Sequence, residues 1–202
     1  MIRQLALGDS YTAGTGVTAA ESWPAQLAKL LREQGLSVAE PALLAQNGCT
    51  SNILHATLQR ALARTDFQHP FDFITVLIGT NDQYDGCSLT EYGHNFRGLL
   101  ERAIGIVDSD PARVIVLSLP DWSVTPFATG RDRDNIAAQI KHFNTVNRRE
   151  SERAGARYLN ITPISRRAAN DVSLLAEDNL HPSAKMYTAW ARLLLPVVLD
   201  IL

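Results

Sequence analysis

The sequence lacks any long apolar run. Within its 202 residues, no hydrophobic stretch approaches the roughly 20 residues that a membrane-spanning helix needs. The first residues also lack the charged region, apolar stretch and small-residue cleavage site of a secretory signal. These absences predict a protein that does not insert into a membrane, and we expect a cytoplasmic location.

Cysteine is scarce, with two residues in the whole chain, Cys49 and Cys87. Two thiols are too few for a disulfide scaffold or a zinc site, so we expect them to be free, although both fall in predicted loops and a bridge between them stays open. An excess of charge of one sign is also absent, because the net charge is -2. Without a basic surface, nucleic acid is not expected as a partner.

The chain does contain a regular alternation of apolar and amphipathic segments. The segment 71–78 is apolar almost throughout, as in a central strand that is covered on both faces. This alternation predicts a single α/β domain over residues 1–202, with a parallel sheet and right-handed crossovers. Pro196 is expected to kink or shorten the last helix. Strands are predicted at 1–7, 36–46, 71–78, 113–119 and 158–161, and helices at 22–34, 51–64, 134–154, from Ser88 and from Ser183.

A serine follows directly on the first predicted strand. In Gly8-Asp9-Ser10, the glycine predicts a tight turn that lifts the hydroxyl out of the sheet, where a nucleophile can be presented. Gly48 and Asn81 also come just past strand ends, and the carboxyl ends of parallel strands share one edge of a sheet. We therefore expect the N–H groups of Ser10 and Gly48 and the side-chain amide of Asn81 to converge on a developing oxyanion.

The candidate base for this serine is His181. An aspartate three residues earlier, Asp178, can reach its Nδ1, hold one tautomer and stabilise the imidazolium that forms during reaction. Asp171 is an alternative orienting carboxylate, but the three-residue spacing favours Asp178. Asp9 and Asp82 are expected to hold loop backbones rather than act as acids.

A second Asp-x-x-His-Pro sequence occupies residues 66–70. It precedes the strand at 71–78, so it falls at the opposite edge of the sheet from Asn81. A strand of that length spans about 26 Å, which is too far for proton transfer with Ser10. His69 is therefore predicted to be a loop histidine. Three further histidines fall on predicted helices and are expected to be structural: His55, His94 and His142.

The short motifs around Ser10, Gly48, Asn81 and His181 together resemble the four sequence blocks of the SGNH hydrolases, the group that includes the GDSL lipases and esterases. The resemblance implies a flavodoxin-like three-layer α/β/α sandwich with a five-stranded parallel sheet. It also implies Ser10 as nucleophile, His181 as base with Asp178 as its partner, and an oxyanion hole from Ser10, Gly48 and Asn81. Tyr11 stands where the GDSL motif has leucine, a position without a chemical role. The four blocks occur in the family's order: Gly8-Asp9-Ser10-Tyr11, Asn47-Gly48, Gly79-Thr80-Asn81-Asp82 and Asp178-Asn179-Leu180-His181-Pro182.

The predicted activity is hydrolysis of small, short-acyl esters, because the chain has no lid insertion and no amphipathic lipid-binding segment. No metal or cofactor is implied, since the carboxylate, imidazole and amide groups all have triad or oxyanion roles. A thioesterase or lysophospholipase, and a carbohydrate O-acetyl esterase or acetyltransferase, would use the same residues. A non-enzymatic binding module is the alternative from another class.

Apolar side chains in the loops after the third and fourth strands have two interpretations. They form a substrate pocket at the rim of the site, or they cover the end of the hydrophobic core. The sequence does not decide between them. The residues concerned are Tyr84, Trp122, Val124 and Phe127.

Overall fold

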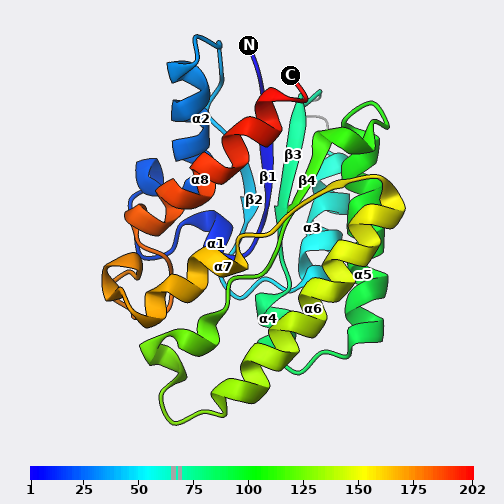
Figure 1. The fold of residues 1–202 in the computed structure, drawn as a ribbon. Coiled ribbons are helices and arrows are strands. Elements are labelled where there is room, and N and C mark those ends of the chain that lie inside the picture. The colour runs from blue at the N-terminus through cyan, green and yellow to red at the C-terminus, as the bar shows by residue number, and fades with distance from the viewer. Residues whose placement is uncertain (65–66, 68–69) are drawn as a thin grey trace.

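A parallel sheet forms the centre of the computed structural model, which describes residues 1–64, 67 and 70–202. Within these residues the sheet has five strands in the order β2-β1-β3-β4-β5, all parallel (Figure 1). This is the flavodoxin-like order, and the predicted fold class is confirmed. The strands are β1 (Gln4–Gly8), β2 (Ala42–Ala45), β3 (Phe73–Leu77), β4 (Val114–Leu117) and β5 (Arg157–Leu159).

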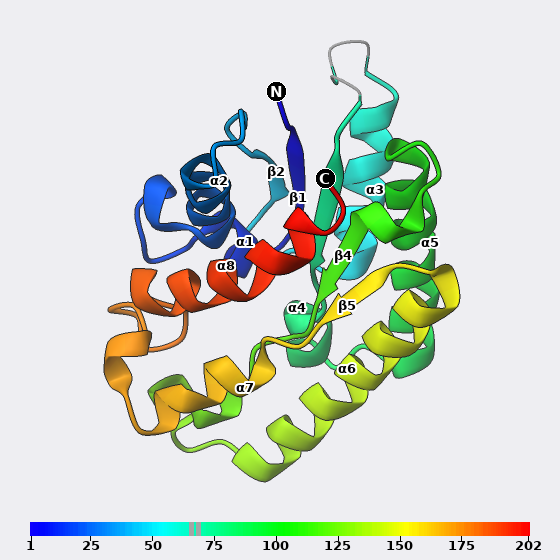
Figure 2. The same ribbon diagram turned by 45° about the horizontal axis from the view of Figure 1, so that its top comes forward.

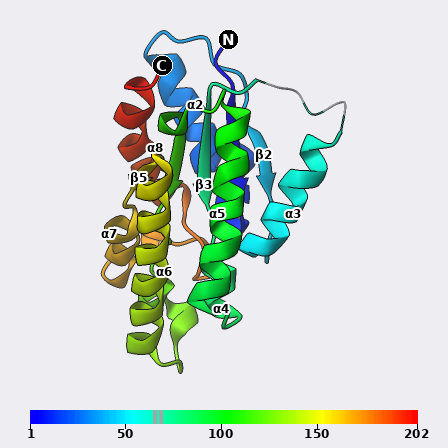
Figure 3. The same ribbon diagram turned by 90° about the vertical axis from the view of Figure 1, so that its right-hand side faces the viewer.

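Helices cover both faces of the sheet and complete three layers. Figure 2 shows α2 (Trp23–Glu33) and α8 (Ala184–Leu199) on one face. On the other face lie α3 (Ser51–Leu62), α5 (Leu89–Ile106) and α6 (Arg133–Ala154), and α5 and α6 run side by side (Figure 3). Three short helices follow strand ends: α1 (Ser10–Ala13), α4 (Thr80–Tyr84) and α7 (Thr162–Ser165).

The core lies on both sides of the central strands. Every residue of β1 and β3 is buried, as the apolar sequence of the third strand predicts. Trp23 on α2 and Trp190 on α8 are fully buried and fill the layer between these helices and the sheet. Among the described residues, no helix is long and apolar enough to cross a bilayer.

Three local predictions need correction. The segment 36–46 forms a strand only at β2, because this edge of the sheet is half-exposed and pairs with β1 alone. The helix predicted at 22–34 is α2, which begins only at Trp23; Ser22 is its N-cap residue, and the Ser22 hydroxyl donates to the carbonyl of Ala19. Pro196 does not shorten α8, which continues past it to Leu199. His69, the predicted loop histidine, lies outside the described residues.

Candidate active site

A tight turn between β1 and α1 carries Ser10. Asp9 is the N-cap of α1, and its Oδ1 accepts a hydrogen bond from the backbone N–H of Tyr11 at 3.0 Å. A Cβ at Gly8 would lie 2.2 Å from Thr12 Oγ1 and 2.6 Å from the carbonyl oxygen of Leu77. Only glycine fits there, so the close approach of β1 to α1 depends on it.

A chain of hydrogen bonds links Ser10, His181 and Asp178. His181 Nε2 lies 2.9 Å from Ser10 Oγ, and His181 Nδ1 lies 2.5 Å from Asp178 Oδ2. Burial raises the pKa of Asp178, but hydrogen bonds from the His181 side chain and from the N–H groups of Leu180 and His181 outweigh it and leave the pKa below its ordinary value. Asp178 is therefore ionised at neutral pH and suited to stabilise an imidazolium.

The segment that carries Asp178 and His181 is a short hairpin. Leu175 and Pro182 form an antiparallel bridge, and the N–H of Ala176 donates to the carbonyl of His181 at 2.8 Å. Asp178 Oδ1 also accepts the N–H groups of residues 180 and 181, so one carboxylate holds both the turn and the imidazole.

Two residues that the sequence reasoning missed support this hairpin. A Cβ at Gly16, where φ is +87°, would meet Ala176 Cβ at 2.7 Å, so the loop after α1 lies directly against the hairpin. The Tyr11 ring packs against the imidazole with a centroid distance of 5.2 Å. A glycine in a loop and the residue after a nucleophile carry little signal by themselves, because their partner lies more than 150 residues away along the chain.

Asp171, the alternative partner for His181, is engaged elsewhere. Its Oδ2 lies 2.8 Å from Lys185 Nζ, and its Oδ1 accepts from the N–H and hydroxyl of Ser173. The hydrogen bonds from Lys185 and Ser173 lower the pKa of Asp171 to about 2. This carboxylate anchors the start of α8 to the preceding loop.

The other two predicted oxyanion residues line the same pocket as Ser10 and His181. Gly48 has φ of +72°, in the left-handed region that favours glycine. Asn81 lies in α4, and its Nδ2 donates to the carbonyl of Cys49 at 2.9 Å. This bond holds the amide in place and uses one of its two hydrogens, so the second is free to donate.

Two buried carboxylates, Asp82 and Asp9, hold the loops of the site, but neither belongs to the hydrogen-bonded chain of Ser10, His181 and Asp178. Asp82 accepts hydrogen bonds from the N–H and hydroxyl of Ser51 at 2.9 and 2.6 Å, which ties α4 to the start of α3. Asp9 caps α1, as expected, and its Oδ2 has no hydrogen-bond partner among the described residues. Burial raises the pKa of Asp9 to about 7, the Tyr11 N–H opposes this, and the charge of Asp82 adds to it.

Replacing Asp9 with asparagine is expected to stabilise the protein above pH 7. The unfolded carboxyl ionises near pH 4 and the folded one near pH 7, so the native state binds more protons in between. Stability is therefore lost as the pH rises through this window, by an amount on the order of 4 kcal/mol. Asparagine keeps the oxygen that accepts from Tyr11. Urea unfolding from pH 4 to 8 measures this. The free energy of unfolding should depend less on pH in Asp9→Asn than in the wild type, and the same pH dependence in both proteins would contradict a raised pKa of Asp9.

A pocket of about 290 Å³ opens beside Ser10. Three of the four apolar residues predicted at the rim line it, and we call this set, Tyr84, Trp122 and Phe127, the aromatic wall. Val124, the fourth, packs against the hydrophobic core instead. The remaining lining residues are Ser10, Tyr11, Asn47, Gly48, Thr80, Asn81, Leu180 and His181.

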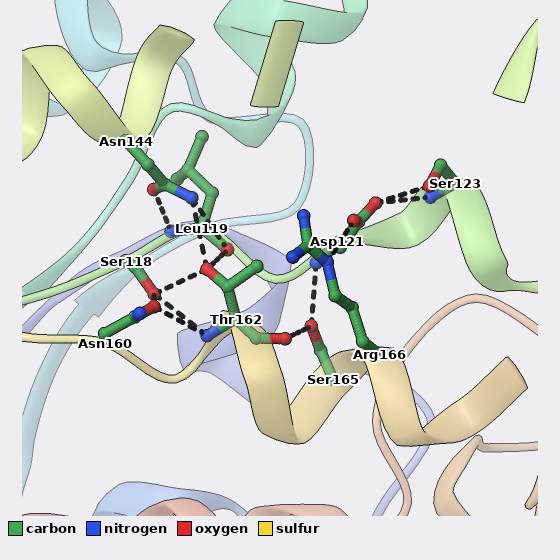
Figure 4. A network of polar contacts seen from close by, with 9 residues as sticks. All are labelled: Ser118, Leu119, Asp121, Ser123, Asn144, Asn160, Thr162, Ser165 and Arg166. Atoms are coloured by element: carbon green, nitrogen blue, oxygen red, sulfur yellow. Dashed lines mark hydrogen bonds and ion pairs between the residues drawn. The ribbon is translucent and has the colours of Figure 1, made fainter. Parts of the chain in front are cut away.

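Polar contacts hold the loop after β4, which carries Trp122. Asp121 is buried and pairs with Arg166 at 2.8 Å, and its N–H donates to Ser165 Oγ (Figure 4). The indole N–H of Trp122 donates to Gln83 Oε1 at 2.8 Å. Trp122 is therefore the buried, hydrogen-bonded ring of the aromatic wall. The two outer rings are more exposed to solvent, with exposed fractions of 49% for Tyr84 and 38% for Phe127.

The remaining candidate groups lie outside the site. His55 accepts from Arg102 Nε at 2.9 Å between α3 and α5, and His94 and His142 line a groove between α5 and α6. Cys49 and Cys87 are both free thiols. Within the described part of the chain, no group of three or more histidine, cysteine, aspartate or glutamate side chains could hold a metal ion.

Comparisons with known proteins identify the family and the fold. The model of the GDSL-like lipase/acylhydrolase family matches residues 6–189. The crystal structure of TesA is similar over 99% of both chains, with 19% identity and a TM-score of 0.75. The acetylxylan esterase Axe2 from Geobacillus stearothermophilus matches with 17% identity and a TM-score of 0.72, covering 98% of this chain and 94% of that one.

A third solved structure has the same fold. The psychrotrophic esterase EstA from Pseudoalteromonas sp., in a structure inhibited by monoethylphosphonate, is similar over 100% of this chain and 94% of its own, with 18% identity and a TM-score of 0.68. No curated protein sequence matches the chain.

Proposed function

The chain belongs to the GDSL-like lipase/acylhydrolase family and is a carboxylic ester hydrolase, and on this premise we propose that it is a serine esterase acting on small, short-acyl esters. The observation that carries the proposal is the hydrogen-bonded chain of Asp178, His181 and Ser10, which ends in a pocket of about 290 Å³. These three residues supply a nucleophile, a base and an orienting carboxylate that contact one another in sequence.

In the proposed reaction, Ser10 Oγ attacks the carbonyl carbon of the ester while its proton passes to His181 Nε2. Asp178 stabilises the imidazolium that results. The negative oxygen of the tetrahedral intermediate accepts hydrogen bonds from the N–H groups of Ser10 and Gly48 and from the free hydrogen of Asn81 Nδ2.

Collapse of that intermediate breaks the bond to the alcohol, which takes the proton from His181 and leaves. A water molecule then attacks the acyl-enzyme, with His181 removing one of its protons. The second intermediate collapses to the carboxylic acid and restores the Ser10 hydroxyl, so the two half-reactions use the same groups in the same places.

The volume of the pocket supports short acyl groups. A space of about 290 Å³ lies just below the range for small-molecule sites, roughly 300 to 1,000 Å³. Its apolar lining, the aromatic wall and Leu180, suits a hydrocarbon group of a few carbons.

We expect kcat/KM for p-nitrophenyl esters to fall by at least about tenfold from butyrate to octanoate, because an acyl chain too long for the pocket must bind in a strained position that weakens its transition-state contacts. The series from acetate to octanoate, with initial rates at neutral pH, measures this. Acyl-CoA thioesters, lysolipid and acetylated xylo-oligosaccharides serve as comparison substrates. Rates that rise to octanoate would contradict a short-acyl pocket, and a higher kcat/KM for one comparison class would assign the site to that class. Absence of Ser10 labelling by a fluorophosphonate would favour a binding module.

A further inference from the structure

The three rings of the aromatic wall form a cage whose members come from two separate loops. Tyr84 ends α4 after β3, whereas Trp122 and Phe127 belong to the loop after β4. Their centroids lie 5.8 Å apart for Tyr84 and Trp122, 5.9 Å for Trp122 and Phe127, and 6.5 Å for Tyr84 and Phe127. Each ring is tilted or edge-on to the others, so the three faces converge instead of stacking.

The side chain of Arg131 occupies this cage. Its Cζ lies 5.2 Å from the Tyr84 centroid, 5.7 Å from that of Trp122 and 5.1 Å from that of Phe127. Nη2 also donates to the Tyr84 hydroxyl at 3.1 Å. Arg131 itself is exposed and lies just before α6. In the described part of the chain it takes part in no ion pair, so the rings are the main partners of its charge.

Aromatic cages attract cations through the negative faces of their rings. The guanidinium of Arg131 lies over all three rings and so places a positive charge against them. The same rings line the pocket beside Ser10. Arg131 itself does not line that pocket, so its charge lies on the side of the rings away from the substrate. A substrate group that reaches the wall therefore meets rings whose attraction for a second cation is weakened by the positive charge behind them.

From this arrangement we propose that Arg131 is a specificity-determining residue, whose charge behind the aromatic wall disfavours esters that carry a cationic group in the pocket. The substrates of the site are accordingly neutral or anionic short esters. This inference rests on the proposed esterase function, because it assigns the charge preference of that same pocket.

The test uses two acetate esters of matched shape, that of choline and that of 3,3-dimethylbutanol, which differ in a positive nitrogen against a neutral carbon. The wild-type protein should favour the neutral ester in kcat/KM by at least about fivefold. In Arg131→Met an unbranched side chain remains and the charge behind the rings is lost, so the ratio should shift toward the choline ester by about tenfold. Arg131→Lys, which keeps a charge, should stay close to the wild-type ratio.

Controls separate this effect from general damage. Arg148, an exposed residue of α6, contacts Glu152 at 2.8 Å and none of the wall, so Arg148→Met should keep the wild-type ratio. Because both esters are measured on each variant, a general loss of rate cancels in the ratio. Tetramethylammonium should inhibit hydrolysis of the neutral ester more strongly in Arg131→Met, and in a second variant, Arg131→Gln, than in the wild type.

The outcomes are distinguishable. Equal use of the two esters by the wild type, or an unchanged ratio and unchanged inhibition in both neutral variants, would overturn the role of Arg131 while the esterase proposal stands. A wild-type protein that hydrolyses neither these esters nor the p-nitrophenyl series would overturn both proposals. A reversed or strongly shifted ratio confined to Arg131→Met and Arg131→Gln would support the inference.

Discussion

Replacing Ser10 with alanine is expected to lower kcat for p-nitrophenyl butyrate by at least about 10⁵-fold, because no acyl-enzyme can form. The residual rate would come from the oxyanion donors and from substrate positioning, which do not need the hydroxyl. Initial rates of hydrolysis measure the effect, and mass spectrometry after fluorophosphonate treatment shows whether the protein still takes a covalent label.

Stability should change little in this variant. The hydrogen bond of the Ser10 hydroxyl runs to His181, while α1 is held by the backbone N–H groups and by Asp9. Alanine is a good helix former, and the thermal midpoint is expected to stay within a few degrees of the wild type. Ser37→Ala, an exposed serine in the loop after α2, is the matched control and should retain wild-type rates. Near-wild-type hydrolysis by Ser10→Ala would exclude Ser10 as the nucleophile.

The second large effect is expected from Asp178→Asn, which should lower kcat by about 10³- to 10⁴-fold. Asparagine can still accept the N–H groups of Leu180 and His181 through Oδ1, so the hairpin should keep its shape. Opposite His181 Nδ1, however, an amide replaces a carboxylate, which favours the wrong tautomer and removes the charge that stabilises the imidazolium. The KM should move much less than kcat.

Asp171→Asn provides the comparison for this prediction. Asp171 pairs with Lys185 and Ser173, so its loss should loosen the start of α8 without a large change in kcat. Steady-state kinetics of the two variants side by side decide the assignment. A large loss in Asp171→Asn together with a mild effect in Asp178→Asn would transfer the orienting role to Asp171.

The short-range features of this protein can be predicted from its sequence. Apolar periodicity locates the strands, and a glycine before Ser10 indicates the turn that presents it. Three-residue spacing brings Asp178 to His181 because a tight turn needs no other part of the chain. Parallel strands in an α/β protein end at one edge, which is why Ser10, Gly48 and Asn81 could be expected together before any contact was known.

Other features depended on which loops meet in space. Gly16 carries no sequence signal for its contact with Ala176, and the raised pKa of Asp9 follows from burial that the packed helices create. The positions of Tyr84, Trp122, Val124 and Phe127 in the sequence could not show whether they line a pocket or cover the end of the core. That depends on the direction in which each side chain points.

The sequence by itself thus determined the α/β fold class, through the alternation of apolar and amphipathic segments. It pointed to the residues of the proposed triad through motif spacing and the resemblance to the SGNH hydrolases. The tertiary structure decided the surroundings of the site. It made Trp122 both a buried core residue and part of the pocket lining, and it packed Val124 against the core away from the pocket. It also brought Arg131 onto rings from two different loops. Such contacts arise from the paths of loops over the folded sheet, and residues that meet in this way share no spacing along the chain.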